Sequence, residues 1–223
     1  MKPYYDEDGI TIYCGDCREI LPHLPKVDLV LTDIPYGEVN RPSSGLRNLD
    51  KGNADTINGG EIEAVLNLDA DSFYVWCGTE QVSGLRSGFV AGGYTTRLGV
   101  WEKSNPSPMN GEYLWLSGLE CCVFARRTGA AFNEFCKSPI WRGPTQGETE
   151  HPTEKPLWLF KTLVAASSDH WQTILDPFMG SGTTLVAAKQ LGRKAIGIEI
   201  EEKYCEIAVQ RLAQKVMDFG SAA

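Results

Sequence analysis

The pattern of apolar and polar positions along the chain predicts an α/β protein. Short runs rich in β-branched and aromatic residues recur, and several are apolar at nearly every position, which is typical of strands buried on both faces of a sheet. Helical patterns lie between these runs, so we expect a sheet with helices on both faces. The seven predicted strands are Ile10 to Cys14, Val27 to Thr32, Phe73 to Cys77, Thr96 to Trp101, Leu119 to Ala125, Thr173 to Leu175 and Ala195 to Ile198.

Three segments repeat apolar residues at helical spacing. One runs from about Thr183 to Leu191 and ends before Gly192, a residue suited to a left-handed cap. Another opens at Pro156, because proline is favoured in the first turn of a helix. The clearest follows Glu199 and repeats on Tyr204, Ile207, Ala208, Arg211, Leu212 and Val216.

Two segments interrupt this alternation. Gly37 to Gly60 is rich in glycine and asparagine, and Arg127 to His151 is similarly irregular. Loops longer than about 15 residues are uncommon in compact domains and are usually functional or disordered. Both segments adjoin the chemical motifs described below, which favours a functional role.

Length and composition favour one domain over residues 1–223. The chain has 223 residues and 42% of them are hydrophobic, enough for a sizeable core. No apolar run approaches the roughly 20 residues that a membrane-spanning helix needs. The N-terminus turns acidic without an apolar run behind it, unlike a signal peptide. We therefore expect a soluble, cytoplasmic protein with no membrane partner.

The formal net charge of -8 argues against a protein that coats nucleic acid non-specifically. A local basic face remains compatible with it, because electrostatic steering depends on where charge lies. Six basic residues in or beside the irregular segments are candidate nucleic-acid contacts, and ordinary solvated surface is the alternative interpretation of each. They are Arg41, Arg47, Lys51, Arg126, Arg127 and Arg142.

The cysteines do not indicate a metal site. Seven are scattered along the chain, and Cys14 and Cys17 alone have the spacing of metal ligands or a redox pair. No second pair or nearby histidine completes a zinc site. We expect no bound metal.

A glycine turn follows the strand predicted at Thr173 to Leu175. The sequence Asp-Pro-Phe-Met-Gly-Ser-Gly-Thr-Thr, residues 176–184, leads from that strand into a helix, and its glycines allow close approach of a ligand. It lacks the third glycine of a dinucleotide turn and the lysine of a P-loop. Glu199 ends the next strand, 19 residues after Gly180, and a carboxylate at this distance can accept hydrogen bonds from ribose hydroxyls. S-adenosylmethionine, a nucleoside without pyrophosphate, fits this combination.

A second motif, Asp33-Ile34-Pro35-Tyr36, directly follows the apolar run Val27 to Thr32. Ligands in open α/β sheets bind beyond the carboxyl ends of strands. The Asp33 carboxylate and the Ile34 carbonyl can accept hydrogen bonds from the two N–H groups of an aromatic amine. These bonds would localise the lone pair on the nitrogen. Pro35 fixes the turn, and Tyr36 offers a flat face for an extruded base. The alternative is a structural turn in which the aspartate forms hydrogen bonds within the protein and binds no ligand.

The two motifs resemble those of the DNA amino-methyltransferases. That family has a tetrad [DNS]-P-P-[YFW] and a loop D-P-F-x-G-S-G-T-T, which residues 176–184 match at every fixed position. Ile34 replaces the tetrad's first proline. Because the family uses this residue's main-chain carbonyl, we expect the change to be tolerated, with altered rate or turn geometry as the alternative.

The order of the motifs is similar to the permuted arrangement called the beta group. The tetrad comes first and the glycine turn last, preceded by His151-Pro152-Thr153-Glu154-Lys155-Pro156. An N-terminal element around Asp16 and a strand-end element, residues 100–106, also resemble that group. The resemblance implies a Rossmann-like fold with seven mostly parallel strands, one of them reversed. It implies that the cofactor is bordered by Asp16, Asp33, Lys155, Asp176, Pro177, Phe178, Gly180, Ser181, Gly182, Thr183, Thr184 and Glu199.

The resemblance implies a site-specific methyltransferase that acts on double-stranded DNA by base flipping. Aspartate in the tetrad favours the N6 amine of adenine, since the family's cytosine-N4 enzymes more often carry serine there. Cytosine-N4, RNA and protein-amide methylation are alternatives, and so is a cofactor-binding module without turnover. Residues 37–60 and about 105–150 are left for a minimal target-recognition region, or recognition is shared across a homodimer.

Overall fold

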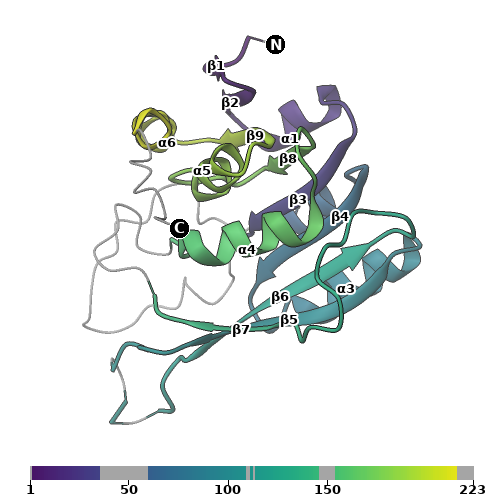
Figure 1. Ribbon diagram of the computed structural model, residues 1–223, viewed down its shortest axis with the longest axis vertical. Coiled ribbons are helices and arrows are strands. Elements are labelled where there is room, and N and C mark those ends of the chain that lie inside the picture. The colour runs from purple at the N-terminus through teal and green to yellow at the C-terminus, as the bar shows by residue number, and fades with distance from the viewer. Residues whose placement is uncertain (1, 36–59, 109–110, 113, 146–153, 215–223) are drawn as a thin grey trace, which may run out of the picture.

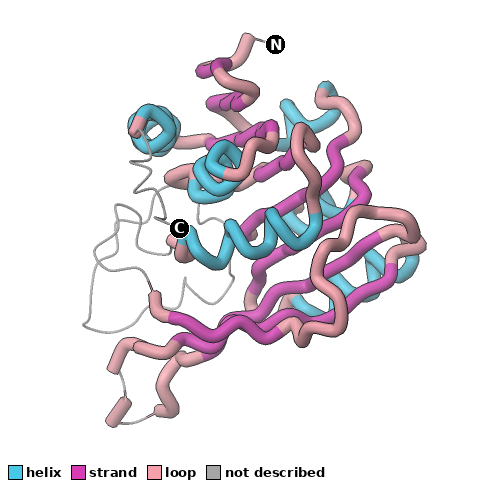
Figure 2. Tube along the Cα trace, in the orientation of Figure 1, coloured by secondary structure: helices cyan, strands magenta, loops and turns pink. Residues whose placement is uncertain are grey.

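The computed structural model describes residues 2–35, 60–108, 111–112, 114–145 and 154–214. Within them, nine strands form one sheet in the order β1-β2-β9-β8-β3-β4-β6-β5-β7 (Figures 1 and 2). The strands are β1 (Tyr5–Glu7), β2 (Ile10–Cys14), β3 (Val27–Asp33), β4 (Ala70–Cys77), β5 (Thr95–Lys103), β6 (Leu119–Arg126), β7 (Ile140–Gly143), β8 (Thr173–Asp176) and β9 (Lys194–Glu199).

Helices cover both faces of the sheet, as the sequence predicts. They are α1 (Cys17–Ile20), α2 (Glu61–Leu66), α3 (Val82–Ala91), α4 (Leu157–Ser167), α5 (Thr183–Gln190) and α6 (Glu202–Ala213), with a 3-10 turn η1 (Leu21–His23). The last three helices pack on one face, against a cluster that includes Leu29, Leu31 and Trp76. The first three pack on the other face, around Val30, Phe73 and Val75. Side chains from successive residues of β3 thus feed both layers of the core.

The expected seven strands are all present, each within three residues of its predicted bounds. The expectation of seven strands with one reversed is wrong. The described residues form nine strands, and two of these, β1 and β6, are reversed. The extra strands, β1 and β7, lie at the two edges and have three and four residues. Edge strands this short bury few side chains, so their sequences carry little apolar pattern. β7 also shows that Arg127 to His151 is not irregular throughout.

Helix α3 was not predicted from the sequence, because it contains two glycines and glycine has poor helix propensity. Gly88 has a packing reason: a Cβ atom at this position would lie 2.4 Å from Leu66 Cδ1 of α2. The glycine therefore allows the two helices to approach closely. Local propensity is outweighed here by a tertiary contact.

The strand directions bring chemistry-bearing residues to one edge of the sheet. Seven strands point the same way, so Cys14, Asp33, Cys77, Lys103, Gly143, Asp176 and Glu199 end together along what we call the carboxyl edge. The reversed strand β6 contributes its beginning to this edge, because Leu119 pairs with Glu102. Among the described residues, no helix is both long and apolar enough to span a bilayer.

Candidate active site

The turn formed by residues 33–35 extends β3 at the carboxyl edge. Asp33 pairs with Trp76 of β4, and the Ile34 N–H donates to the Trp76 carbonyl at 3.1 Å. The Ile34 side chain is 1% exposed and packs in the core. Proline has no N–H and could not make this bond, so isoleucine lengthens the β3–β4 ladder where the related family has proline. Gln81 donates to the Pro35 carbonyl at 3.1 Å and holds the far side of the turn. Tyr36 lies outside the described residues.

The glycine turn, residues 177–182, follows the adjacent strand β8. Gly180 and Gly182 have φ angles of +50° and +81°, in the left-handed region that favours glycine. A Cβ atom on Gly182 would lie 2.8 Å from the Ala208 Cβ of α6. The turn is thus a close-fitting cradle of backbone, and no larger residue fits at position 182.

Asp176 joins the two turns. Its carboxylate is buried and accepts hydrogen bonds from Thr32 Oγ1 at 2.7 Å, Thr184 Oγ1 at 2.5 Å and the Phe178 N–H at 3.1 Å. Burial raises the pKa of Asp176 to about 6, against the lowering effect of these donors. Thr32 is the covalent neighbour of Asp33. The glycine turn is therefore fixed, through one carboxylate, directly to the strand end that carries Asp33.

Glu199 and Asp16 end the next two strands along the edge. Glu199 accepts the Gly180 N–H at 3.0 Å and the Glu201 N–H at 2.8 Å. Burial raises its pKa, and these backbone donors oppose part of the rise. A carboxylate offers about four lone-pair sites, so acceptor capacity remains for a ligand hydroxyl. Asp16 caps α1 by accepting the Arg18 N–H, and its neighbour Gly15 donates to the Glu199 carbonyl at 2.8 Å.

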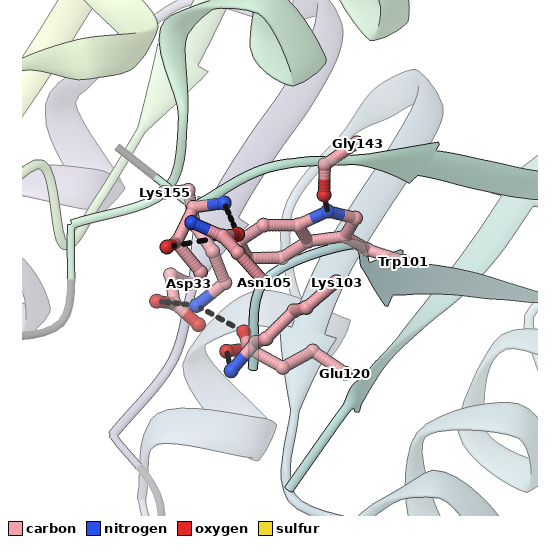
Figure 3. A network of polar contacts seen from close by, with 8 residues as sticks. Asp33, Trp101, Lys103, Asn105, Glu120, Gly143 and Lys155 are labelled. Atoms are coloured by element: carbon pink, nitrogen blue, oxygen red, sulfur yellow. Dashed lines mark hydrogen bonds and ion pairs between the residues drawn. The ribbon is translucent and has the colours of Figure 1, made fainter. Parts of the chain in front are cut away.

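Lys155 lies against Asp33. The resemblance implies that Lys155 borders the cofactor, which stays a prediction, and the structure places its Nζ in a part-buried ion pair with Asp33 Oδ2 and 3.1 Å from Glu120 Oε2 (Figure 3). Burial alone would lower the pKa of Lys155, but the two carboxylates outweigh it and raise the pKa above its ordinary value. The lysine therefore stays charged.

Glu154 and Arg211 are functional candidates that the sequence analysis missed. Glu154 accepts hydrogen bonds from Ser181 Oγ at 3.0 Å and Thr183 Oγ1 at 3.1 Å, both at the glycine turn. Arg211 of α6 forms an ion pair with Glu154 at 2.6 Å and donates to the Ser181 carbonyl at 2.8 Å. A signal was present: Arg211 interrupts the apolar stripe predicted for its helix, which indicates a partner inside the fold.

The predicted DNA contacts are distributed unevenly. β6 is reversed, so Arg126 and Arg127 lie at the opposite edge from Asp33; Arg126 donates to the Ala130 carbonyl at 2.6 Å and Arg127 pairs with Asp69 at 2.7 Å. The structure does not bring these two to the site. Arg142 of β7 does lie at the carboxyl edge, where it pairs with Glu102 at 2.7 Å. The other three predicted contacts, Arg41, Arg47 and Lys51, lie outside the described residues.

A glycine cradle, a carboxylate on the next strand and a second acceptor turn, all at one edge of a mixed α/β sheet, define the class of S-adenosylmethionine-dependent methyltransferases. The chain belongs to the DNA methylase family (N6_N4_Mtase), whose model matches residues 75–210, more than half of its length. It is an S-adenosylmethionine-dependent DNA methyltransferase, and this confirms the predicted family, fold class and cofactor.

Curated relatives match over nearly the whole chain. The type II methyltransferase M2.DpnII of Streptococcus pneumoniae is 28% identical over 247 residues, which cover 95% of this chain and 92% of that protein. M2.LlaDCHI of Lactococcus lactis subsp. cremoris is 29% identical with the same coverage.

Solved structures agree with this. The M1.HpyAVI–SAM complex is 27% identical with a TM-score of 0.74, covering 92% of this chain and 100% of that one. The PvuII cytosine-N4-specific DNA methyltransferase, 16% identical with a TM-score of 0.73 over 97% of this chain and 90% of that one, shares the fold.

Replacing Arg211 tests its contacts with the glycine turn. Arg211→Met would leave the buried Glu154 carboxylate without its cation, and we expect the free energy of unfolding to fall by about 3 kcal/mol. Arg127→Met is the matched control, since its partner Asp69 is exposed and the loss should stay below about 1 kcal/mol. Urea denaturation measures both, and equal losses in the two variants would contradict the assignment.

The pKa of Asp176 makes stability depend on pH. Because that pKa is raised from 3.8 to about 6 on folding, the folded protein binds more protons here than the unfolded chain between these values. This stabilising contribution is complete below about pH 4 and is lost as the pH rises through 6. Relative to Asp176→Asn, the wild type should therefore lose about 3 kcal/mol of unfolding free energy between pH 4 and pH 7. A difference that stays constant with pH would refute this.

Proposed function

We propose that this enzyme methylates the N6 amine of adenine in double-stranded DNA, after the base has been turned out of the helix. The observation that carries the proposal is the bond between Thr32 and Asp176, which fixes Asp33 next to the glycine turn. Acceptor and cofactor cradle thus hold one relative position before any ligand binds. Such preorganisation is the main source of acceleration in group transfers that need no strong base.

The Asp33 carboxylate and the Ile34 carbonyl are the two acceptors for the amine. The lone pair of an aromatic amine is delocalised into the ring, and hydrogen bonds from both N–H groups draw the nitrogen toward a tetrahedral shape. The Ile34 N–H and the Pro35 carbonyl are both bonded to β4 or the segment after it, so the peptide plane is held firmly. Tyr36 follows directly in sequence and is the proposed stacking platform for the base.

The glycine turn and the neighbouring strand ends form the proposed cofactor site. Glu199 and Asp16 accept the ribose and adenine ends of the nucleoside, the backbone of residues 177–182 borders it, and Phe178 is half-buried beside it. When bound there, S-adenosylmethionine would supply the methyl group from its sulfonium sulfur, and the amine nitrogen held by Asp33 and Ile34 would accept it and lose one proton. The fit rests on the positive φ angles at Gly180 and Gly182, which shape the backbone of the turn beside Glu199 and Asp176.

Target recognition falls to residues 37–60 and about 105–150, within a single methyltransferase domain. The part of the second region that lies between β5 and β6 leaves the carboxyl edge, and Trp115 in it is fully exposed. Arg142 lies at the same edge, and its surface ion pair is weak enough to exchange for a phosphate. A homodimer would double this small recognition surface on a duplex.

Methyl mapping tests the function directly. Purified protein, labelled S-adenosylmethionine and unmodified DNA are incubated, and the modified bases are mapped by sequencing. We expect N6-methyladenine at one short site. N4-methylcytosine would overturn the adenine assignment, and label in RNA or protein but not in DNA would overturn the substrate class.

Two variants separate the acceptor from the cofactor site. Asp33→Ala removes one of the two acceptors, so methyl transfer should fall by about 1000-fold or more while the cofactor Kd changes little. Glu199→Ala instead removes hydrogen bonds to a charged group and should weaken cofactor binding by about 10-fold or more. Calorimetry gives the Kd and label incorporation gives the rate. Wild-type turnover in Asp33→Ala, or an unchanged Kd in Glu199→Ala, would disprove the respective role.

A further inference from the structure

Lys155 is a buried cation at the carboxyl edge, and its ammonium contacts the acceptor side of the site. Its side chain is 4% exposed, and its ammonium lies against Asp33 Oδ2, 3.1 Å from Glu120 Oε2 and 5.9 Å from the centre of the Trp76 ring. A buried lysine is stabilised by such carboxylates, and the face of an indole ring adds attraction for a cation. The position of the ammonium is therefore set by three groups at once.

Glu120 continues this row of charges. Its Oε1 lies 2.6 Å from Lys103 Nζ, and Lys103 itself stacks 5.4 Å from the centre of the Trp101 ring. Glu120 Oε2 is buried and makes no hydrogen bond of good geometry with a described residue, so the charge of Lys155 compensates it. Figure 3 shows the resulting alternation of Asp33, Lys155, Glu120 and Lys103 across the ends of β3, β5 and β6. Two negative and two positive side chains leave no net charge.

We propose that Lys155 is a positioning residue for Asp33, held in place by Glu120, and that it does not bind the cofactor. This inference rests on the proposed function, because it assumes that Asp33 accepts the target amine. Glu120 and Lys103 then form the outer support of the acceptor. Neither residue touches the reacting atoms in this assignment.

The chemistry of the acceptor explains why it needs such support. An ionised carboxylate offers only hydrogen-bond acceptors, and the neighbouring ammonium attracts one of its oxygens and holds it in place. Lys155 occupies one lone-pair site of Asp33 Oδ2 and leaves acceptor capacity for an amine. It also restricts rotation of the side chain, which fixes the direction from which the amine must approach. Moving Lys155 to a cofactor group would remove the cation between Asp33 and Glu120 and leave only Lys103, on the other oxygen of Glu120.

The first test is Lys155→Met. Without the ammonium, Asp33 loses the cation that holds its side chain and faces the Glu120 carboxylate, so we expect kcat to fall about 100-fold. The cofactor Kd, measured by calorimetry without DNA, should stay within about twofold, since no cofactor contact is lost. Lys26→Met is the matched control: Lys26 precedes the other end of β3 and pairs with Asp71 at 2.6 Å. Its kcat should equal that of the wild type.

The second test is the double variant Lys155→Met with Glu120→Gln, which removes the facing charge along with the lysine. We expect kcat to recover by about fivefold or more over Lys155→Met, although it remains below the wild type. Glu120→Gln alone should lower kcat, because Lys155 then loses one of its two anchors. A residue with a merely structural role would give added losses rather than recovery. The double variant also keeps the test valid if repulsion between the facing carboxylates prevents Lys155→Met from folding.

The two tests distinguish a positioning role of Lys155 from a cofactor-binding role. A cofactor Kd that rises in Lys155→Met with kcat unchanged would overturn the proposal and make Lys155 a cofactor residue. Wild-type kcat in Lys155→Met, or further loss in the double variant, would also overturn it. Failure of the proposed function shows differently, as an absence of methylated DNA with the wild-type enzyme. If the wild type yields methylcytosine, the adenine assignment fails while the same comparison of kcat still decides the role of Lys155.

Discussion

The ion pair between Lys155 and Asp33 is the contact on which the geometry of the site depends. It joins the end of β3 to the segment before α4, two parts of the chain separated by 122 residues. The Lys155 ammonium could not remain charged there alone without a large loss of stability, because its side chain is only 4% exposed. Each charge therefore determines where the other lies, and the acceptor for the target amine inherits that position.

The residue next to Lys155 makes the corresponding contact on the cofactor side. Glu154 binds Ser181 and Thr183 at the glycine turn, together with Arg211 of α6. In an extended segment successive side chains point in opposite directions, so one dipeptide can reach two sites. Glu154 and Lys155 thus connect the cofactor cradle to the acceptor. The bond from Thr32 to Asp176 is a second, independent connection between them. Methyl transfer needs donor and acceptor in line, and both connections serve that requirement.

Much of this could be predicted from the sequence because it is local. The buried strands are continuous apolar runs, and the glycine turn and the Asp33 turn follow two of them directly. The contact of Lys155 with Asp33 could not be found this way, since it depends on how a distant segment crosses the sheet. Arg126 and Arg127 were candidate DNA contacts because they adjoin an irregular segment, but β6 is reversed, and this places them at the opposite edge from Asp33. Short edge strands such as β7 are formed by pairing with a neighbour rather than by their own pattern.

A crystal structure of the enzyme with target DNA and an unreactive cofactor analogue tests the proposed geometry of the acceptor most directly. We predict that one Asp33 oxygen and the Ile34 carbonyl each lie about 3 Å from the N6 nitrogen of an extruded adenine. Lys155 Nζ should remain on Asp33 and Glu120 in that complex. A base whose amine lies away from both acceptors, or a Lys155 ammonium that has moved onto the cofactor, would contradict it.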